Sequence, residues 1–172
     1  MLLFLLVEGS DDERFAEAIL KTLFSRYYLD VKIIRYAQKP KKYINNLIKS
    51  ANAMNADYIL LTDFNSSPCI THRKNKMLNV FRFCDESKIQ VIVQEIEGWY
   101  VAGLDNQSVN KLKLPAFEPS DSITKEQFDA IIPKKFQRRD FLIELLKNFS
   151  FDFATEQNKS FKYFAEKYSL QI

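Results

Sequence analysis

The stretch MLLFLLVEGSDDE, residues 1–13, sets seven apolar residues without a break directly before an acidic run. A short unbroken apolar run is typical of a strand buried on both faces, as in the interior of a parallel sheet. Ligands of open α/β sheets bind just past the carboxyl ends of such strands. Glu8 therefore stands where chemistry usually takes place, and Gly9 permits a tight turn into the next element.

The acidic residues that follow fit the beginning of a helix. We expect Ser10 or Asp11 to cap it, and carboxylates in the first turn interact favourably with the positive end of the helix dipole. This interpretation explains Asp11 and Glu13. It does not explain Glu8, which precedes the helix, and Asp12 lies one helical turn after Glu8 and can point back to it.

The composition is that of an ordinary soluble globular protein, with 47% apolar and 27% charged residues in a chain of 172. The net charge of +3 is too small to establish a polyanionic partner, although clustered charges would allow one. Cys69 and Cys84 lack the spacing of a zinc site and are too few for a disulfide framework. Residues 1–7 are too short for a membrane span and follow no basic region, so we expect a cytoplasmic protein.

Apolar strands alternate with amphipathic helical segments in the first part of the chain. This alternation is typical of an α/β fold with a mostly parallel four-stranded sheet flanked by helices. Strands are predicted at residues 1–7, 31–36, 57–62 and 89–93. Three helices are predicted: the first at residues 12–28, the second from Pro40 onward, and the third at residues 72–85. Tyr27 is expected on the apolar face of the first helix.

The pattern changes after about Leu104. Residues 104–122 have mixed polarity and two prolines, which favours an irregular segment. The sequence therefore predicts an α/β domain at residues 1–104 and a helical C-terminal extension, residues 105–172, packed on it. Helices of the extension are predicted at residues 125–132, 138–149 and 160–168.

Three of the predicted strands end in acidic residues: the first at Glu8, the third at Asp63, and the fourth at Glu95 and Glu97. If these strands are parallel neighbours, the carboxylates converge at one edge of the sheet. Carboxylates without His or Cys partners suit a hard cation, Mg²⁺ or Mn²⁺, which can activate water in phosphodiester cleavage. Taken singly, Asp63 also fits a turn, and Glu95 and Glu97 also fit a helix start.

The segment VEGSDDERF after the first strand, together with DFN after the third, resembles a TOPRIM domain. This is the metal-binding fold of type IA and type II topoisomerases, bacterial primases and OLD-family nucleases. Glu8 corresponds to the family's Glu after the first strand, and Asp63 to the first Asp of its Asp-x-Asp. Glu8, Gly9 and Asp12 match the Glu-Gly-x-x-Asp of the OLD-like branch.

The resemblance is closest to small stand-alone bacterial TOPRIM-like proteins and spans most of the chain. Those proteins carry a Glu-x-Glu-x-Trp segment, matched here by Glu95, Glu97 and Trp99, and a Ser-Phe near the C-terminus, matched by Ser160 and Phe161. The resemblance implies a TOPRIM-like, Rossmann-like sheet, Mg²⁺ or Mn²⁺ as cofactor, and DNA or RNA as partner. It also implies an ATPase partner protein and a role in defence or repair.

Asn65 departs from the family pattern, because it stands where the second Asp would be. Its carbonyl oxygen can bind a cation but brings no charge.

Two hypotheses about the function stay open. In the first, the chain is a Mg²⁺- or Mn²⁺-dependent TOPRIM nuclease with Glu8 and Asp63 as catalytic residues. In the second, it is a non-catalytic module that binds nucleic acid or protein and whose metal site has decayed. The predicted metal ligands are Glu8, Asp12, Asp63, Asn65, Glu95 and Glu97.

Basic residues near the predicted metal site can hold a phosphate backbone. Arg73, Lys74 and Lys76 are predicted to do so, and the groups at residues 39–42 and 134–139 are further candidates. Each group also fits an ordinary solvated basic face. A phosphoacceptor receiver domain is disfavoured, because no lysine follows a fifth strand.

Four other residues allow a functional and a structural interpretation. His72, the only histidine, is either a general base or a solvated loop residue. Trp99 and Tyr100 either stack on bases or pack against the sheet. Ser160 is expected to cap the last helix.

Overall fold

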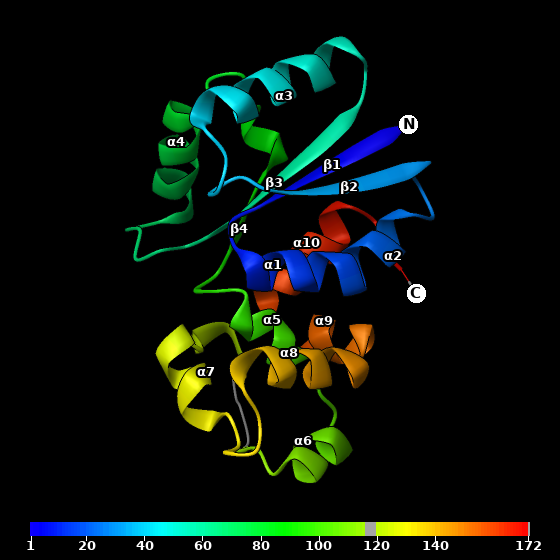
Figure 1. The fold of residues 1–172 in the computed structure, drawn as a ribbon, viewed down its shortest axis with the longest axis vertical. Helices are drawn as coiled ribbons and strands as arrows, with labels where there is room; N and C mark the ends of the chain where they lie inside the picture. The colour runs from blue at the N-terminus through cyan, green and yellow to red at the C-terminus, as the bar shows by residue number, and fades with distance from the viewer. Residues whose placement is uncertain (116–119, 172) are drawn as a thin grey trace. The chain divides into compact units, whose positions relative to one another are not determined.

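The computed structural model describes residues 1–115 and 120–171 and consists of two compact units, Met1–Ile92 and Val93–Ile172 (Figure 1). The sequence pattern predicts the corresponding boundary at residue 104. The difference arises from α5 (Glu97–Ala102), a short helix that packs against other elements of the second unit.

The first unit contains a four-stranded parallel sheet with the strand order β2-β1-β3-β4. The predicted α/β class with a parallel sheet is thereby confirmed. The central strands carry the unbroken apolar runs because both of their faces are covered, so that residues such as Leu5 and Leu60 have no exposed surface. The strands are β1 (Leu2–Val7), β2 (Asp30–Arg35), β3 (Asp57–Asp63) and β4 (Ile89–Ile92).

Helices cover both faces of this sheet (Figure 1). On one face, α3 (Lys41–Ala53) and α4 (Ile70–Val80) pack with alternate strand residues such as Phe4 and Leu60 into one core. The other face is covered by α1 (Ser10–Phe15), the π-helical turn η1 (Ala16–Leu20) and α2 (Lys21–Phe24), which follow one another without a break.

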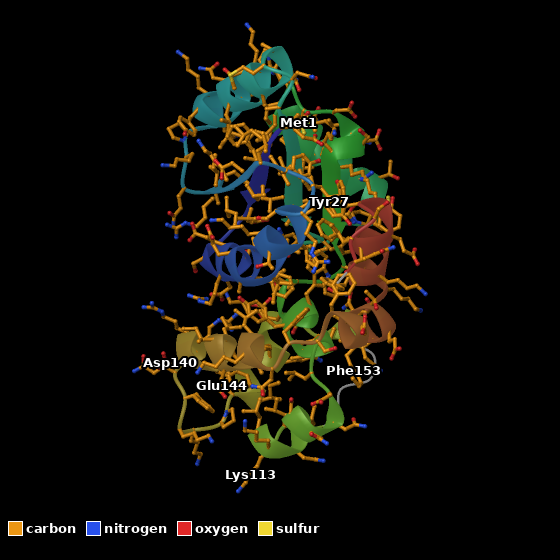
Figure 2. All side chains as sticks on the ribbon, turned by 90° about the vertical axis from the view of Figure 1, so that its right-hand side faces the viewer. Met1, Tyr27, Lys113, Asp140, Glu144 and Phe153 are labelled. Atoms are coloured by element: carbon orange, nitrogen blue, oxygen red, sulfur yellow. The ribbon has the colours of Figure 1, made fainter. Side chains whose placement is uncertain are left out.

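The helix predicted at residues 12–28 is shorter at its C-terminal end. It ends at Phe24, and Tyr27 follows it with 53% of its surface exposed rather than lying on the buried face (Figure 2). The backbone N–H groups of Tyr27 and Tyr28 still donate to the carbonyl oxygen of Phe24, which closes the helix in a turn.

The first helix begins differently from the prediction that Ser10 or Asp11 caps it. Gly9 is the N-cap residue, and the Asp12 carboxylate reaches back to accept a hydrogen bond from the Gly9 backbone N–H at 3.0 Å. A carboxylate at this third helical position satisfies a donor that the helix itself leaves unpaired. Asp11 instead forms an ion pair with Arg14 at 2.7 Å.

The second unit is helical. The prediction that residues 104–122 are irregular is wrong for part of this segment, because α6 (Asn106–Leu112) lies within it. Asp105 caps α6 by accepting a hydrogen bond from the backbone N–H of Ser108 at 2.7 Å. Residues 116–119 of the segment lie outside the described residues. The helices after α5 are α6 (Asn106–Leu112), α7 (Lys125–Ile131), α8 (Arg138–Lys147), α9 (Phe151–Gln157) and α10 (Lys159–Lys167).

Aromatic side chains form the core of the second unit. Trp99 is fully buried, contacts the rings of Phe161 and Phe164 at centroid distances of 5.1 and 5.2 Å, and donates its indole N–H to the hydroxyl of Ser160 at 2.7 Å. Tyr100 is fully buried as well, so both residues pack in a core and offer no face to a base. The predicted cap at Ser160 is wrong: the side chain of Asn158 caps α10. Within residues 1–115 and 120–171, no helix has the length and apolar character needed to cross a membrane.

Candidate functional site

The ends of β1 and β3 bring two of the predicted residues to one edge of the sheet. These strands are parallel neighbours, with Leu6 opposite Leu60, so the carboxyl ends of both strands lie at the same edge of the sheet. Glu8 follows β1 directly, and Asp63 is the last residue of β3. The edge is therefore the one at which ligands of open α/β sheets bind.

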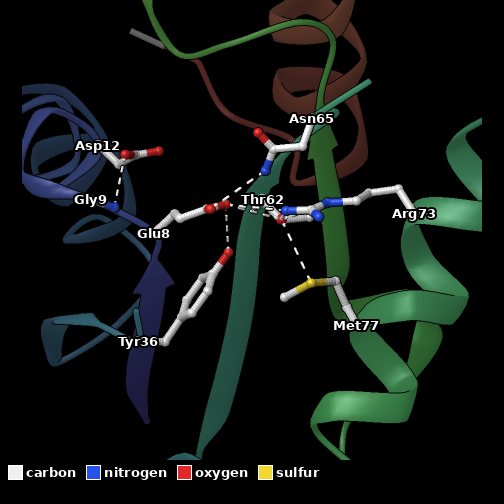
Figure 3. Close-up of polar contacts among 8 residues, drawn as sticks. All are labelled: Glu8, Gly9, Asp12, Tyr36, Thr62, Asn65, Arg73 and Met77. Atoms are coloured by element: carbon white, nitrogen blue, oxygen red, sulfur yellow. Dashed lines mark hydrogen bonds and ion pairs between the residues drawn. The ribbon is translucent and has the colours of Figure 1, made fainter. Parts of the chain in front are cut away.

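The Glu8 carboxylate is surrounded by hydrogen-bond donors (Figure 3). Its Oε2 atom accepts from the hydroxyl of Tyr36 at 3.0 Å and from the guanidinium of Arg73 at 3.2 Å. The same oxygen lies 3.4 Å from the donating hydroxyl of Thr62. The Oε1 atom accepts from the side-chain amide of Asn65 at 3.4 Å. Four side chains from different parts of the first unit thus fix one carboxylate.

Arg73 is the least expected of these partners, because its side chain is only 6% exposed. It projects from α4 and also donates from Nε to the hydroxyl of Thr62 at 3.0 Å. A buried guanidinium needs an opposite charge and hydrogen bonds to offset its lost hydration. Glu8, whose side chain is 33% exposed, supplies the charge, so the pair is buried at the arginine and open to solvent at the carboxylate.

Tyr36 behaves as a fixed donor to this carboxylate. Its burial, reinforced by the negative charge of Glu8, raises the pKa of the Tyr36 hydroxyl well above its ordinary value. The hydroxyl therefore keeps its proton at neutral pH and continues to donate to Glu8. It is suited to hold the carboxylate in place and unsuited to act as a base.

Asn65 lies in the turn after β3 with φ of 47°, in the left-handed region that Asn adopts more readily than most residues. Its amide nitrogen, and hence a donor, faces Glu8. In this arrangement Asn65 donates a hydrogen bond to the carboxylate and does not turn its oxygen toward it.

Asp12, a predicted metal ligand, takes part in the start of the first helix. Its carboxylate lies over the backbone N–H of Gly9 (Figure 3) and the residue is 6% exposed. One oxygen of the side chain is thus used to begin the first helix.

Glu95 and Glu97, the other predicted ligands, belong to the second unit and have partners there. Glu97 is the first residue of α5, is 4% exposed, and accepts a hydrogen bond from the guanidinium of Arg138. Burial raises the pKa of the Glu97 carboxyl, although Arg138 acts in the opposite direction. Glu95 accepts a hydrogen bond from the backbone N–H of Lys125 at the beginning of α7.

The three predicted phosphate-binding residues all lie on α4 but differ in burial and in partners. Arg73 is buried against Glu8, Lys74 lies 3.9 Å from Glu86 in an ion pair, and Lys76 is exposed. His72 is also exposed and lies in the first turn of α4 rather than in a loop.

These side chains as they lie do not fit Mg²⁺ or Mn²⁺. Within residues 1–115 and 120–171, no group of three or more His, Cys, Asp and Glu side chains gathers closely enough to hold a metal ion. A divalent cation on Glu8 would also meet the guanidinium of Arg73, and like charges at such distances repel each other. Arg73 supplies a positive charge next to Glu8.

Comparison with known proteins gives the following. No family model and no curated protein matches the chain. Among solved structures, the C-terminal region of the Xanthomonas campestris pv. campestris OLD protein is similar with 17% identity and a TM-score of 0.36, over 84% of this chain and 78% of that one. The C-terminal region of the Burkholderia pseudomallei OLD protein is similar with 16% identity and a TM-score of 0.39, over 92% of this chain and 89% of that one. With identities and TM-scores this low, the function has to be inferred from the residues of the site.

The partners of Glu8 were not predicted from the sequence. One signal for Arg73 was present: it lies four residues before Met77, on the face of α4 that is buried. An arginine on an apolar helix face needs a buried acceptor, and Glu8 was the strand-end carboxylate not otherwise explained. Tyr36, directly after β2, carried no comparable signal.

Proposed function

We propose that this chain is a TOPRIM-type module that binds nucleic acid without hydrolysing it, in which Arg73 takes the place of a metal ion. The observation that supports this proposal is the pair of Arg73 and Glu8, with the arginine side chain 6% exposed and the two groups 3.2 Å apart.

The energetics of this pair oppose the entry of a metal. A cation that took over the Glu8 carboxylate would leave the Arg73 guanidinium buried without its counter-charge. Removing one partner of a buried pair typically costs about 3–5 kcal/mol. A bound metal ion would have to offset that cost. It would have one carboxylate fewer to bind to than the TOPRIM pattern supplies, because Asn65 is neutral.

Binding of nucleic acid is supported by the positive charges around the same edge. Lys39, Lys41 and Lys42 are exposed at the beginning of α3, and the first two line the same pocket as Glu8 and Arg73. Exposed lysines of this kind neutralise backbone phosphates and release counterions, which favours binding at low salt.

Phosphodiester hydrolysis with Mg²⁺ or Mn²⁺ is the second candidate function, and one observation favours it. Glu8 and Asp63 leave adjacent parallel strands at the same edge, and the Glu8 side chain is still 33% exposed. In that case these two residues would be the catalytic carboxylates. The state described here, with Arg73 on Glu8, would then have to rearrange before a metal could bind.

Two measurements on the purified chain distinguish these functions. Fluorescence anisotropy with labelled single- and double-stranded DNA and RNA tests binding, and gel electrophoresis after incubation with Mg²⁺ or Mn²⁺ tests cleavage. We expect binding that weakens with salt, and no cleavage. Cleavage that is lost in Glu8→Gln would overturn the proposal in favour of the nuclease, and failure to bind any nucleic acid would overturn it outright.

Charge-neutralising variants identify the binding surface. Lys39→Gln with Lys41→Gln should weaken binding and reduce its salt dependence by roughly two released counterions. The matched control is Lys147→Gln with Lys162→Gln, two lysines of the second unit whose side chains are 65% and 58% exposed. Equal weakening by both pairs would show that binding follows net charge alone.

A further inference from the structure

A pocket of about 290 Å³ opens beside Glu8 in the first unit. Its charged lining consists of Lys39, Lys41, Arg73 and Glu8, and its apolar lining includes Tyr36 and Phe81. The volume is near the lower limit for sites that bind small molecules, about 300 Å³. Such a pocket has room for one compact ligand and none for a duplex.

The positive charges in this pocket are available to a ligand. Lys39 and Lys41 are exposed, and the Lys39 ammonium lies 5.6 Å from the centre of the Tyr43 ring, which holds it near the beginning of α3. Lys41 is the first residue of that 13-residue helix, whose positive end also favours an anion. The negative charge of Glu8 is offset by Arg73, so the lining is positive overall.

The apolar wall of the pocket consists of packed, mostly buried side chains. Tyr36 and Phe81 are 7% and 3% exposed and meet edge to face, with ring centres 5.6 Å apart. Met77, which is 5% exposed, extends the same wall. A ligand that fits must therefore carry strong negative charge at one end and a flat or apolar group at the other.

We propose that this pocket binds a nucleoside monophosphate group, with Lys39 and Lys41 on the phosphate and the nucleoside against Tyr36, Met77 and Phe81. A phosphate monoester carries about −1.5 to −2 charges at neutral pH, which matches two lysines better than the single charge of a diester. The same chemistry occurs in a free nucleotide and at the phosphorylated end of a strand. The inference deepens the proposed function and rests on it for the strand-end source of the ligand.

Calorimetry on the full chain tests the pocket with AMP, adenosine and inorganic phosphate as probes. We expect AMP to bind more tightly than either half alone, because only AMP fills both linings. Lys39→Gln with Lys41→Gln should weaken AMP binding at least about tenfold, since charge-assisted hydrogen bonds to both lysines are lost. Lys42→Gln is the matched control, because this exposed lysine is adjacent on the same helix and does not line the pocket. Failure of AMP to bind, or equal binding by the double variant and wild type, would overturn the inference.

Oligonucleotides with a 5′-phosphate, a 3′-phosphate or only hydroxyl ends identify the source of the ligand. Preference for a phosphorylated end, with competition by AMP, supports a strand end, and AMP binding without such a preference supports a free nucleotide. If strands bind equally whatever their ends and AMP does not bind, the pocket proposal fails while the proposed function stands. If AMP binds and no strand does, the proposed function fails while the pocket proposal stands for the free nucleotide.

Discussion

The pair of Glu8 and Arg73 predicts an asymmetric response to mutation. In Glu8→Ala, a guanidinium whose side chain is 6% exposed loses its counter-charge and keeps only Thr62 as a partner among the contacts described above. In Arg73→Met, the remaining carboxylate is 33% exposed and can be hydrated, while it retains Tyr36, and methionine fills the apolar part of the space. The first variant should therefore be the less stable one.

The magnitudes follow from burial. Breaking a buried pair at its carboxylate typically costs about 3–5 kcal/mol, and the exposed part of Glu8 places our expectation at the lower end, about 3 kcal/mol. Arg73→Met removes one hydrogen-bond partner from the Glu8 carboxylate, which is partly hydrated, so this substitution should cost about 1 kcal/mol. The double variant lacks both charges, so it should be about 2 kcal/mol more stable than Glu8→Ala alone.

Urea denaturation followed by far-ultraviolet circular dichroism measures these free energies of unfolding. Additive effects of the two substitutions, within about 0.5 kcal/mol, would refute the reasoning, because residues that do not interact behave in this way. A second measurement tests the substitution of a metal by Arg73. Calorimetric titration with Mn²⁺ should detect tighter binding to Arg73→Met than to wild type, and equal binding would show that the arginine does not occupy the place of a cation.

Three further predictions concern residues whose roles the structure changes or sharpens. Asp12→Ala should cost about 0.5–2 kcal/mol of stability through the lost helix start and leave Mn²⁺ binding unchanged; a loss of metal binding would restore Asp12 as a ligand. Because the pKa of Glu97 is raised, the folded state binds a proton at this carboxyl more tightly than the unfolded state does. The contribution of Glu97 to the free energy of unfolding therefore decreases as the pH rises above the ordinary carboxyl pKa of 4.5. Glu97→Gln should flatten this decrease in urea titrations at several pH values, and an unchanged pH profile would contradict the assignment. Trp99→Phe and Ser160→Ala should each cost about 1–2 kcal/mol, because each removes the buried hydrogen bond between the indole N–H and the Ser160 hydroxyl, and a double variant that costs clearly less than the sum of the two single ones would confirm that they share this bond.

The strands could be predicted from the sequence because strands that are buried on both faces consist almost entirely of apolar residues. The apolar run of residues 1–7 can be recognised without knowing which strands pair with it, and the apolar runs of β3 and β4 follow the same rule. Helix α4 was predicted for the same kind of reason, since its apolar spacing is local.

The surroundings of Glu8 could not be predicted in the same way. Arg73 is separated from Glu8 by 65 positions, and nothing local shows that its side chain turns inward. The start of the first helix was misjudged for a subtler reason: three adjacent acidic residues all suit a helix start, and only the backbone of Gly9 decides which carboxylate reaches back. The short helix α6 was missed because two prolines follow it closely and dominate the pattern of the segment.

The left-handed backbone of Asn65 has an evolutionary consequence. Asp tolerates this conformation about as well as Asn, so the turn after β3 would accept an Asn65→Asp substitution with little conformational cost. The obstacle to a second acid beside Glu8 lies instead at position 73, where the buried guanidinium depends on Glu8 for its counter-charge. For a second acid to be gained here, a change at position 73 should therefore come before the change at position 65.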